Sequence, residues 1–128
     1  MQPTHFAFEA IGTTWKIELG DALDPEERSR LLALIMARIA SFDLAFSRFR
    51  DDSWVMEVAR TPGAYALPSD GAPMLLLYER AYKATGGKVT PLIGRLMEDA
   101  GYDKAYSLQP KTLRPIPRWE DALSFDGT

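Results

Sequence analysis

The chain has 128 residues, of which 46% are hydrophobic and 26% are charged, and its net charge is −3. This composition is that of a globular domain, and the lack of cysteine excludes disulfides, thiolate metal sites and a cysteine nucleophile. Acidic and basic residues are interspersed. The sequence therefore has no basic stripe of the kind that would indicate a nucleic-acid or membrane partner. The start lacks a signal-peptide pattern and no apolar run would span a bilayer, so we expect a cytoplasmic protein.

Period-two alternation of hydrophobic residues near the start predicts strand structure. The alternating residues are Phe6, Phe8, Ala10, Trp15, Ile17 and Leu19. Gly12 interrupts the pattern, so either two strands meet at residues 11–13 or one long strand bends there. A glycine inside a strand pattern often marks a bulge or a close approach by another group.

A long amphipathic helix is predicted from about Pro25 to about Phe46. Asp24 is a good N-cap, and Pro25 suits the first helical position. Hydrophobic residues recur on one side at helical spacing, at Leu31, Ile35, Ile39, Phe42 and Phe46. At the usual rise per residue the helix is about 33 Å long. We expect the sheet to cover its apolar stripe.

Shorter helices are predicted in the rest of the chain. One runs from Ser53 to Ala59, and another follows residues 69–71 and ends at Gly86-Gly87. One face of the second would carry Met74, Leu77, Tyr78, Ala81 and Thr85. Thr90 is expected to cap a third helix, with Pro91 at its first position, that ends at Gly101. Together with the strands, these elements predict an α+β fold.

The C-terminal residues predict one helical turn at 118–123, then a strand at 124–125 that enters a hairpin turn at Asp126-Gly127. The chain stops in that turn, before a second strand. We therefore expect residues 1–128 to be the N-terminal portion of a larger fold. An incomplete core exposes apolar surface, so we also expect oligomers or a second chain that completes the fold.

Catalytic residues are not evident from the sequence. His5 is the only histidine, which leaves no partner for a Ser-His arrangement or a histidine metal site. Neither a Walker phosphate loop nor a GxGxxG motif is present. The carboxylates of Asp43, Asp51, Asp52, Asp99 and Asp103 share no motif spacing, so we interpret them as caps and solvated groups. We therefore predict no catalytic and no metal-binding residue in this chain.

Three short segments have both a structural and a functional interpretation. Gly12 marks either a bulged strand or a place where a planar ligand lies against the backbone. In residues 46–53, two arginines beside Phe49 form either a solvated helix exit or a site for an anionic, ring-bearing ligand. In residues 85–94, a Gly pair, Lys88 and a helix start form either two helix caps or a phosphate cradle.

The order and spacing of these segments resemble the N-terminal half of the FAD:protein FMN transferases, the ApbE family. The resemblance extends from Phe6 to about Phe125. The family pattern has a Met-Gly-Thr near the start, here residues 11–13, and Ser-x-aromatic-basic-x-Asp-Ser, here residues 47–53. Its Thr-Gly-Gly-x-[Phe/Met]-Asp-x-Thr-x-Gly-Pro-Leu corresponds to residues 85–96. Departures from it include Thr90 in place of Asp, Leu92 in place of Thr, and Arg95 in place of Pro.

The resemblance implies which residues contact the flavin. Ile11 stands where the family has a flavin-contacting Met, and Phe49 where an aromatic residue approaches the cofactor. Lys88, Val89 and Thr90 stand in the family's FAD-lining stretch. The departures from the pattern indicate a divergent subgroup.

The resemblance also implies an activity for the whole protein: Mg²⁺-dependent transfer of FMN from FAD to a Thr or Ser of a target flavoprotein. The family's Mg²⁺ ligands and catalytic residues lie in the C-terminal half, so this chain alone is expected to hold part of the FAD without turnover. Two alternatives stay open. One is a non-catalytic flavin-binding or interaction module, which the loss of Asp at position 90 favours, and the other is an FAD pyrophosphatase-like relative.

Overall fold

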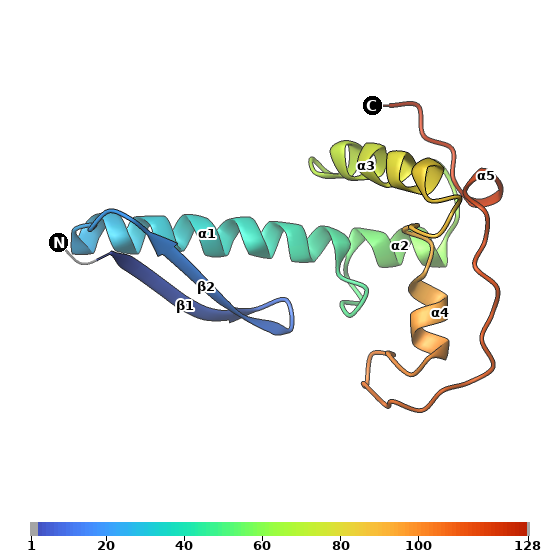
Figure 1. The fold of residues 1–128 in the computed structure, drawn as a ribbon, viewed down its shortest axis with the longest axis horizontal. Coiled ribbons are helices and arrows are strands. Elements are labelled where there is room, and N and C mark those ends of the chain that lie inside the picture. The colour runs from blue at the N-terminus through green and yellow to red at the C-terminus, as the bar shows by residue number, and fades with distance from the viewer. Residues whose placement is uncertain (1–2, 128) are drawn as a thin grey trace. The chain divides into compact units, whose positions relative to one another are not determined.

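The computed structural model describes residues 3–127, and in that range it has two strands and five helices, which confirms the α+β prediction (Figure 1). The elements are β1 (Thr4–Ala10), β2 (Thr13–Leu19), α1 (Pro25–Phe46), α2 (Trp54–Arg60), α3 (Gly71–Ala84), α4 (Gly94–Asp99) and α5 (Trp119–Ala122). The chain divides into two compact units, Met1–Ala59 and Arg60–Thr128.

In the first unit, β1 and β2 form an antiparallel hairpin in a register that runs from Thr4 opposite Leu19 to Ala10 opposite Thr13. Of the two interpretations of this region, two separate strands is therefore the correct one. The loop consists of Ile11 and Gly12, which have φ angles of 51° and 69°. Positive φ at both central residues is the requirement of a type I′ turn, which matches the twist of the strands.

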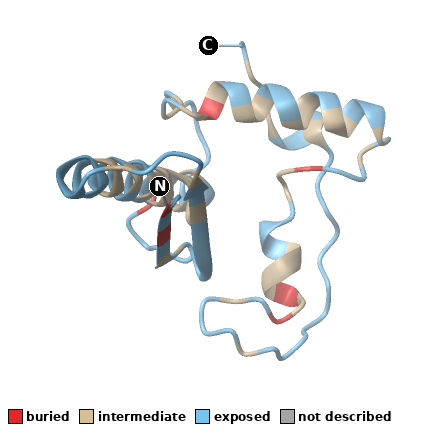
Figure 2. Cartoon of the chain, turned by 60° about the vertical axis from the view of Figure 1, so that its left-hand side comes forward, coloured by how far each residue is buried: buried red, intermediate tan, exposed pale blue. Residues whose placement is uncertain are grey.

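The core of the first unit lies where β1 meets the start of α1. Phe6 is 2% exposed and is the only buried hydrophobic side chain among residues 3–127 (Figure 2). The guanidinium of Arg28, in the first turns of α1, lies 4.9 Å from the centre of the Phe6 ring. Further along the hairpin the Phe8 and Trp15 rings stack at 6.4 Å, but Trp15 is 37% exposed. Burial thus falls from the strand ends toward the hairpin loop.

Helix α1 has the bounds predicted from the sequence, because both of its ends are marked by side chains. The Asp24 carboxylate accepts from the Glu27 backbone N–H at 2.8 Å, and the Glu27 carboxylate accepts from the Asp24 N–H at 3.3 Å. This capping box, with Pro25 in the first turn, stabilises a helix start by about 1 kcal/mol. The helix ends before Ser47, which has an extended backbone.

The apolar stripe of α1 is only partly covered. No residue of the helix is buried. At its C-terminal end, Phe46 packs against Phe42 and against Trp54 of α2, with ring centroids 5.0 and 6.1 Å apart. The five residues of the predicted stripe are half-buried, whereas Leu34 and Leu44, which lie off the stripe, are 59% and 48% exposed. Apolar side chains on other sides of α1 are therefore open to solvent.

In the second unit, α3 ends in a Schellman motif. The Gly87 N–H donates to the Tyr82 carbonyl at 2.8 Å, and the Gly86 N–H donates to the Lys83 carbonyl at 3.4 Å. Gly86 has a φ of 60°, the left-handed conformation that this motif requires at the first residue beyond the cap. The predicted helix end is confirmed. Of the residues predicted to share one face of this helix, Leu77 is 67% exposed.

The next helix begins later than predicted. Thr90 does not cap it: the Thr90 hydroxyl oxygen accepts from the Leu92 N–H at 3.2 Å, which closes a local turn two residues on. Residues 91–93 form turns, and α4 starts at Gly94 with Ile93 at the N-cap position. Because the Thr90 hydroxyl closes a local turn and does not cap a helix, the helix starts at Gly94, three residues after the predicted Pro91.

A clamp holds the long connection after α4. The Arg114 guanidinium donates to both carboxylate oxygens of Asp99 at 2.8 Å, and the Arg114 N–H donates to the same group at 3.0 Å. Asp99 is 5% exposed, and these bonds hold the pKa of its carboxyl at about 2. Gly101, with a φ of 100°, lies so close to Leu108 that a Cβ would come within 2.8 Å of the Leu108 carbonyl carbon.

Near the C-terminus, the predicted helical turn is present as α5, but the predicted strand at 124–125 is not formed. A strand is defined by hydrogen bonding to a neighbour, and within residues 3–127 no neighbouring strand pairs with these residues. Gly127 has a φ of 91°, as a turn residue would. The last residue of the predicted turn, Thr128, lies outside the described residues.

The accessible surface is large for the mass. It amounts to 9531 Å² for a chain of 14.3 kDa. Two separate compact units of half that mass would expose about 8,200 Å² in all. The excess is consistent with the single buried hydrophobic side chain in residues 3–127, and it leaves many apolar side chains open to solvent.

Candidate functional site

The first predicted contact, Ile11, lies at the exposed tip of the β1–β2 hairpin. Its side chain is 49% exposed. A β-branched residue with a φ of 51° is strained, since its Cβ approaches the following carbonyl oxygen. Strained backbone of this kind is often found at binding sites, where the surrounding structure maintains it. Ile11 is therefore exposed and conformationally fixed.

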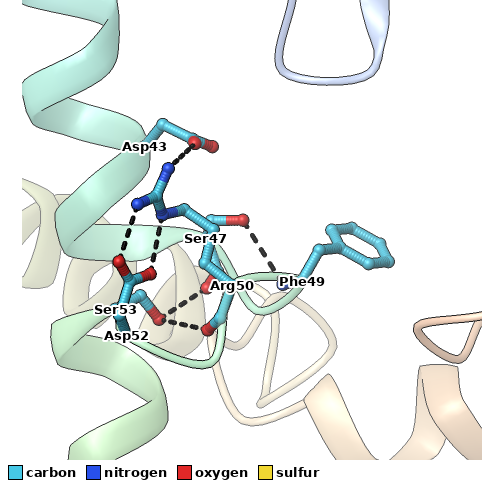
Figure 3. Close-up of polar contacts among 6 residues, drawn as sticks. All are labelled: Asp43, Ser47, Phe49, Arg50, Asp52 and Ser53. Atoms are coloured by element: carbon cyan, nitrogen blue, oxygen red, sulfur yellow. Dashed lines mark hydrogen bonds and ion pairs between the residues drawn. The ribbon is translucent and has the colours of Figure 1, made fainter.

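The second segment is the loop between α1 and α2, and Ser53 is its centre (Figure 3). The Ser53 hydroxyl donates to the Ser47 carbonyl at 2.6 Å and lies 3.1 Å from the Arg50 carbonyl. It also accepts from the Met56 N–H at 3.3 Å, and the residue is 1% exposed. Ser53 thus closes the loop and caps the first turn of α2.

Arg50 also stabilises this loop, through contacts with two carboxylates. Its guanidinium makes two hydrogen bonds to the Asp52 carboxylate, at 2.8 and 2.9 Å, and lies 3.6 Å from the Asp43 carboxylate (Figure 3). The hydrogen bonds to Asp52 raise the pKa of Arg50 and lower the pKa of the Asp52 carboxyl. Of the two arginines considered for an anionic ligand, Arg50 is therefore already paired with acidic side chains.

Phe49 points away from this paired cluster (Figure 3). Its N–H donates to the Ser47 hydroxyl at 3.3 Å, and its side chain is 39% exposed. The guanidinium of Arg48 lies over the Phe49 ring at 4.2 Å, a cation–π contact. The Nη1 atom of Arg48 is buried and makes no hydrogen bond within residues 3–127. The outer edge of the loop therefore presents an aromatic ring stacked with a cation, whose Nη1 atom points into the protein.

The third segment follows α3 and is held by Thr85. The Thr85 hydroxyl donates to the Ala81 carbonyl at 2.7 Å and accepts from the Val89 N–H at 3.0 Å. This fixes the turn from which Lys88 and Val89 project, and both are exposed. Thr90 is 6% exposed, and its hydroxyl is used in the turn to Leu92.

We considered this segment either as two helix caps or as a phosphate cradle. The Gly pair is a helix cap, as the Schellman motif shows. The helix start that both interpretations placed at Thr90 and Pro91 is wrong, because α4 starts at Gly94. The segment still presents one exposed lysine next to backbone of unusual conformation.

The predicted contacts are divided between the two units. Ile11 and Phe49 belong to the first unit, where they occupy a hairpin tip and an interhelical loop. Residues 88–90 belong to the second unit and share one turn. Sequence reasoning considered Arg48 and Arg50 together as anion-binding residues, and the structure separates them: Arg50 is paired with Asp52, whereas Arg48 lies over the Phe49 ring. Sequence reasoning missed the contact between Tyr82 and Trp119, which lie 37 residues apart.

The part of the chain that the structure describes contains no group of three or more His, Cys, Asp or Glu side chains placed to hold a metal ion. None of its helices combines the length and the hydropathy needed to cross a bilayer.

Comparisons with known proteins identify the fold. No protein-family model matches the chain, and no curated protein matches it by sequence. The structure of the apo form of the flavinyl transferase ApbE of Pseudomonas stutzeri matches with a TM-score of 0.68 and 18% identity, over 94% of this chain and 37% of that one. The flavin transferase ApbE from Vibrio cholerae matches with a TM-score of 0.68 and 19% identity, over 94% and 38%.

At such identities the likeness establishes the fold. This chain spans less than two-fifths of the length of either transferase. The chain therefore has the fold of one part of the ApbE flavin transferases, as the order and spacing of its motifs predicted.

Proposed function

We propose that this chain contributes part of the FAD site of an enzyme that transfers FMN from FAD to a Thr or Ser of a target flavoprotein. One observation carries the proposal. The fold is that of part of the ApbE flavin transferases, and within it four of the five residues that the motifs assign to the flavin are exposed: Ile11, Phe49, Lys88 and Val89. The residues that hold the same segments together are buried or paired.

The loop at 47–53 fits a ligand that has both rings and negative charge. FAD has two planar ring systems joined by an anionic pyrophosphate. The exposed ring of Phe49 supplies a stacking surface, and the Arg48 guanidinium over that ring supplies positive charge.

The segment at 88–90 fits in a complementary way. Lys88 is exposed and would attract the pyrophosphate, while Val89, at 42% exposed, offers apolar contact. Thr90 fixes the turn through its bond to the Leu92 N–H. Ile11 would present an apolar side chain to a ring from a rigid hairpin tip.

Mg²⁺ is part of the proposal through the family resemblance, which places its ligands in the C-terminal half of such enzymes. Bound there, it would offset the charge of the pyrophosphate oxygens. In the transfer, the acceptor hydroxyl oxygen bonds to the FMN phosphorus, the phosphoanhydride bond breaks, and AMP leaves with the bridging oxygen. Within this scheme the residues of this chain bind and orient FAD.

We further propose that the open apolar surface of α1 and of the hairpin is covered by the remaining part of the same fold. The structures that match are more than twice as long as this chain. The exposed residues Leu34 and Leu44 would then be buried, at a gain of about 25 cal/mol for each Å² of apolar surface removed from water.

The test is a calorimetric titration of the chain with FAD, with and without Mg²⁺. We expect saturable binding that Phe49→Ala and Lys88→Ala each weaken at least threefold. Matched controls are Tyr102→Ala, which removes another exposed aromatic ring, and Lys16→Ala, which removes another exposed lysine; both should leave binding unchanged. Binding that is equally sensitive to the control variants would contradict the assigned site.

Turnover separates the proposal from its alternatives. An assay of the longest available reading frame with FAD and Mg²⁺ would detect AMP release together with covalent flavin on an acceptor protein if the transferase proposal is correct. AMP and free FMN without covalent flavin would indicate a pyrophosphatase. FAD binding without either product would indicate a flavin-binding module, an interpretation that the Thr90 turn favours because that position has no carboxylate.

A further inference from the structure

The second unit contains a cavity that the proposed flavin site does not use. Its volume is about 330 Å³, and it lies at the C-terminal end of α3. Its lining consists of Glu79, Tyr82, Lys83, Gly86, Gly87, Trp119 and Glu120. A volume of this size is at the lower end of the range for small-ligand pockets, so it would hold a compact group rather than a dinucleotide.

Two aromatic rings form the wall of the cavity and are fixed relative to each other. The Tyr82 and Trp119 rings have centroids 5.8 Å apart and planes inclined at 45°. The Tyr82 hydroxyl oxygen accepts a hydrogen bond from the backbone N–H of Trp119 at 3.2 Å, and this bond links α5 to α3. A Cβ at Gly87 would lie 3.3 Å from the Tyr82 ring, so glycine there allows the ring to lie against the backbone. The aromatic corner is therefore preorganised.

The electrostatics of the cavity favour a cation. Lys83 is paired with Glu79 at 2.8 Å, and the neighbouring Arg118 is paired with Asp121 at 2.8 Å. Glu120 adds one negative charge to these two neutralised pairs. The C-terminal end of the 14-residue helix α3 contributes a further partial negative charge. The faces of aromatic rings are themselves negative, which is why they attract ammonium groups.

We propose that this cavity binds a compact organic ammonium ion, with its methyl or methylene groups against Tyr82 and Trp119 and its charge toward Glu120. An alkylated ammonium suits the site better than a metal ion, because the lining offers ring faces and few oxygen ligands. Lys83 and Gly86 are exposed, which leaves the cavity accessible from solvent. The site contains none of the five residues assigned to FAD, although Gly86 and Gly87 of its lining belong to the same motif as Lys88.

The test uses choline as the probe and 3,3-dimethylbutan-1-ol, its uncharged isostere, as the matched control. Ligand-observed saturation-transfer NMR on the full chain should show choline binding in the millimolar range and binding of the alcohol at least fivefold weaker. In protein-observed spectra, choline should shift the Trp119 indole and Tyr82 ring signals. Equal binding of the two probes, or no binding of either, would overturn the proposal.

Variants locate the site. Trp119→Leu keeps an apolar side chain and removes the ring face, so we expect choline binding to weaken about fivefold. Tyr102→Leu removes an exposed ring that does not line the cavity and should leave binding unchanged. If Trp119→Leu loosens α5, Glu120→Gln tests the charge alone: Glu120 is exposed, and its neutralisation should weaken choline binding about twofold. Choline binding that neither variant weakens would overturn the assignment.

Discussion

The two segments assigned to the flavin, 47–53 and 85–90, are stabilised in different ways. In the first, side chains close the loop: the Ser53 hydroxyl and the Arg50–Asp52 pair. In the second, backbone hydrogen bonds at Gly86 and Gly87 close it, with help from the Thr85 hydroxyl. The same division of roles recurs in both, because the residues that make each loop bond to one another and their neighbours Phe49, Lys88 and Val89 are exposed. Substitution of a loop-forming residue should therefore lower stability, whereas substitution of an exposed neighbour should weaken FAD binding.

Ser53→Ala should give the largest effect on stability. The substitution removes a buried hydroxyl that serves two carbonyls and one N–H, and we expect a loss of about 2 kcal/mol in the free energy of unfolding. Urea denaturation followed by circular dichroism measures it. Ser29→Ala is the matched control, since that hydroxyl is exposed and bonds one carbonyl of its own helix, and its effect should stay within about 0.5 kcal/mol. Equal losses for the two variants would contradict the central role of Ser53.

Gly86→Ala should destabilise less, by about 1 kcal/mol. A Cβ at this position meets no atom within 4 Å, so the cost comes only from the left-handed backbone with a φ of 60°. Gly86→Asn should cost less than Gly86→Ala, because asparagine tolerates this conformation better. The same denaturation assay applies. A clearly larger loss for Asn than for Ala would show that side-chain space, and not backbone conformation, limits this position.

Asp99 allows a pH test in a region where a side chain holds a long connection. The bonds from Arg114 lower the pKa of the folded carboxyl to about 2, below the value of about 3.9 in an unfolded chain. Its contribution to stability is therefore fully present above about pH 4 and is lost as the pH falls toward 2. Asp99→Asn should reduce the melting temperature at pH 7, and the difference from the parent chain should shrink as the pH falls from 4 to 2.

The control for the pH test is Asp121→Asn. Asp121 is exposed and pairs with Arg118 on the surface, where ion pairs contribute little. Its pKa is also lowered, by the hydrogen bonds from Arg118, but its neutralisation should hardly change the melting temperature at pH 7. A melting-temperature difference for Asp99→Asn that stays constant from pH 2 to 7 would show that the Arg114 clamp does not depend on the charge of Asp99.

The sequence predicted those elements whose signals are local. The α1 helix has a capping box and a continuous apolar stripe, and both of its ends were predicted correctly. The start of α4 was predicted wrongly because Thr90 and Pro91 satisfy two rules, a helix cap and a local turn, and only the hydrogen bond to Leu92 shows which applies. The strand at 124–125 has the right residues but no pairing partner among residues 3–127, and pairing is a long-range property that local pattern does not contain.

The candidate site shows the same limit. Exposure of Phe49 follows from the way Ser53 and Arg50 fold the loop, which a motif does not reveal. The Tyr82–Trp119 corner joins residues 37 apart, and no spacing rule connects them. The order of the segments could be read from the sequence, but the direction in which each side chain points is known only from the structure.

Ile11 gives the smallest expected change in stability and the sharpest separation of stability from binding. A β-branched residue is unfavourable in the left-handed conformation, whereas Asn-Gly is the preferred pair for a two-residue hairpin loop. Ile11→Asn should therefore raise the free energy of unfolding by about 0.5–1 kcal/mol, in contrast to the losses at Ser53 and Gly86. If Ile11 contacts the flavin, the same variant should weaken FAD binding, because it removes apolar surface at the exposed hairpin tip. A variant that is stabilised and binds FAD as tightly as the parent chain would place Ile11 outside the site, and the strain at the hairpin tip would then have no role in binding.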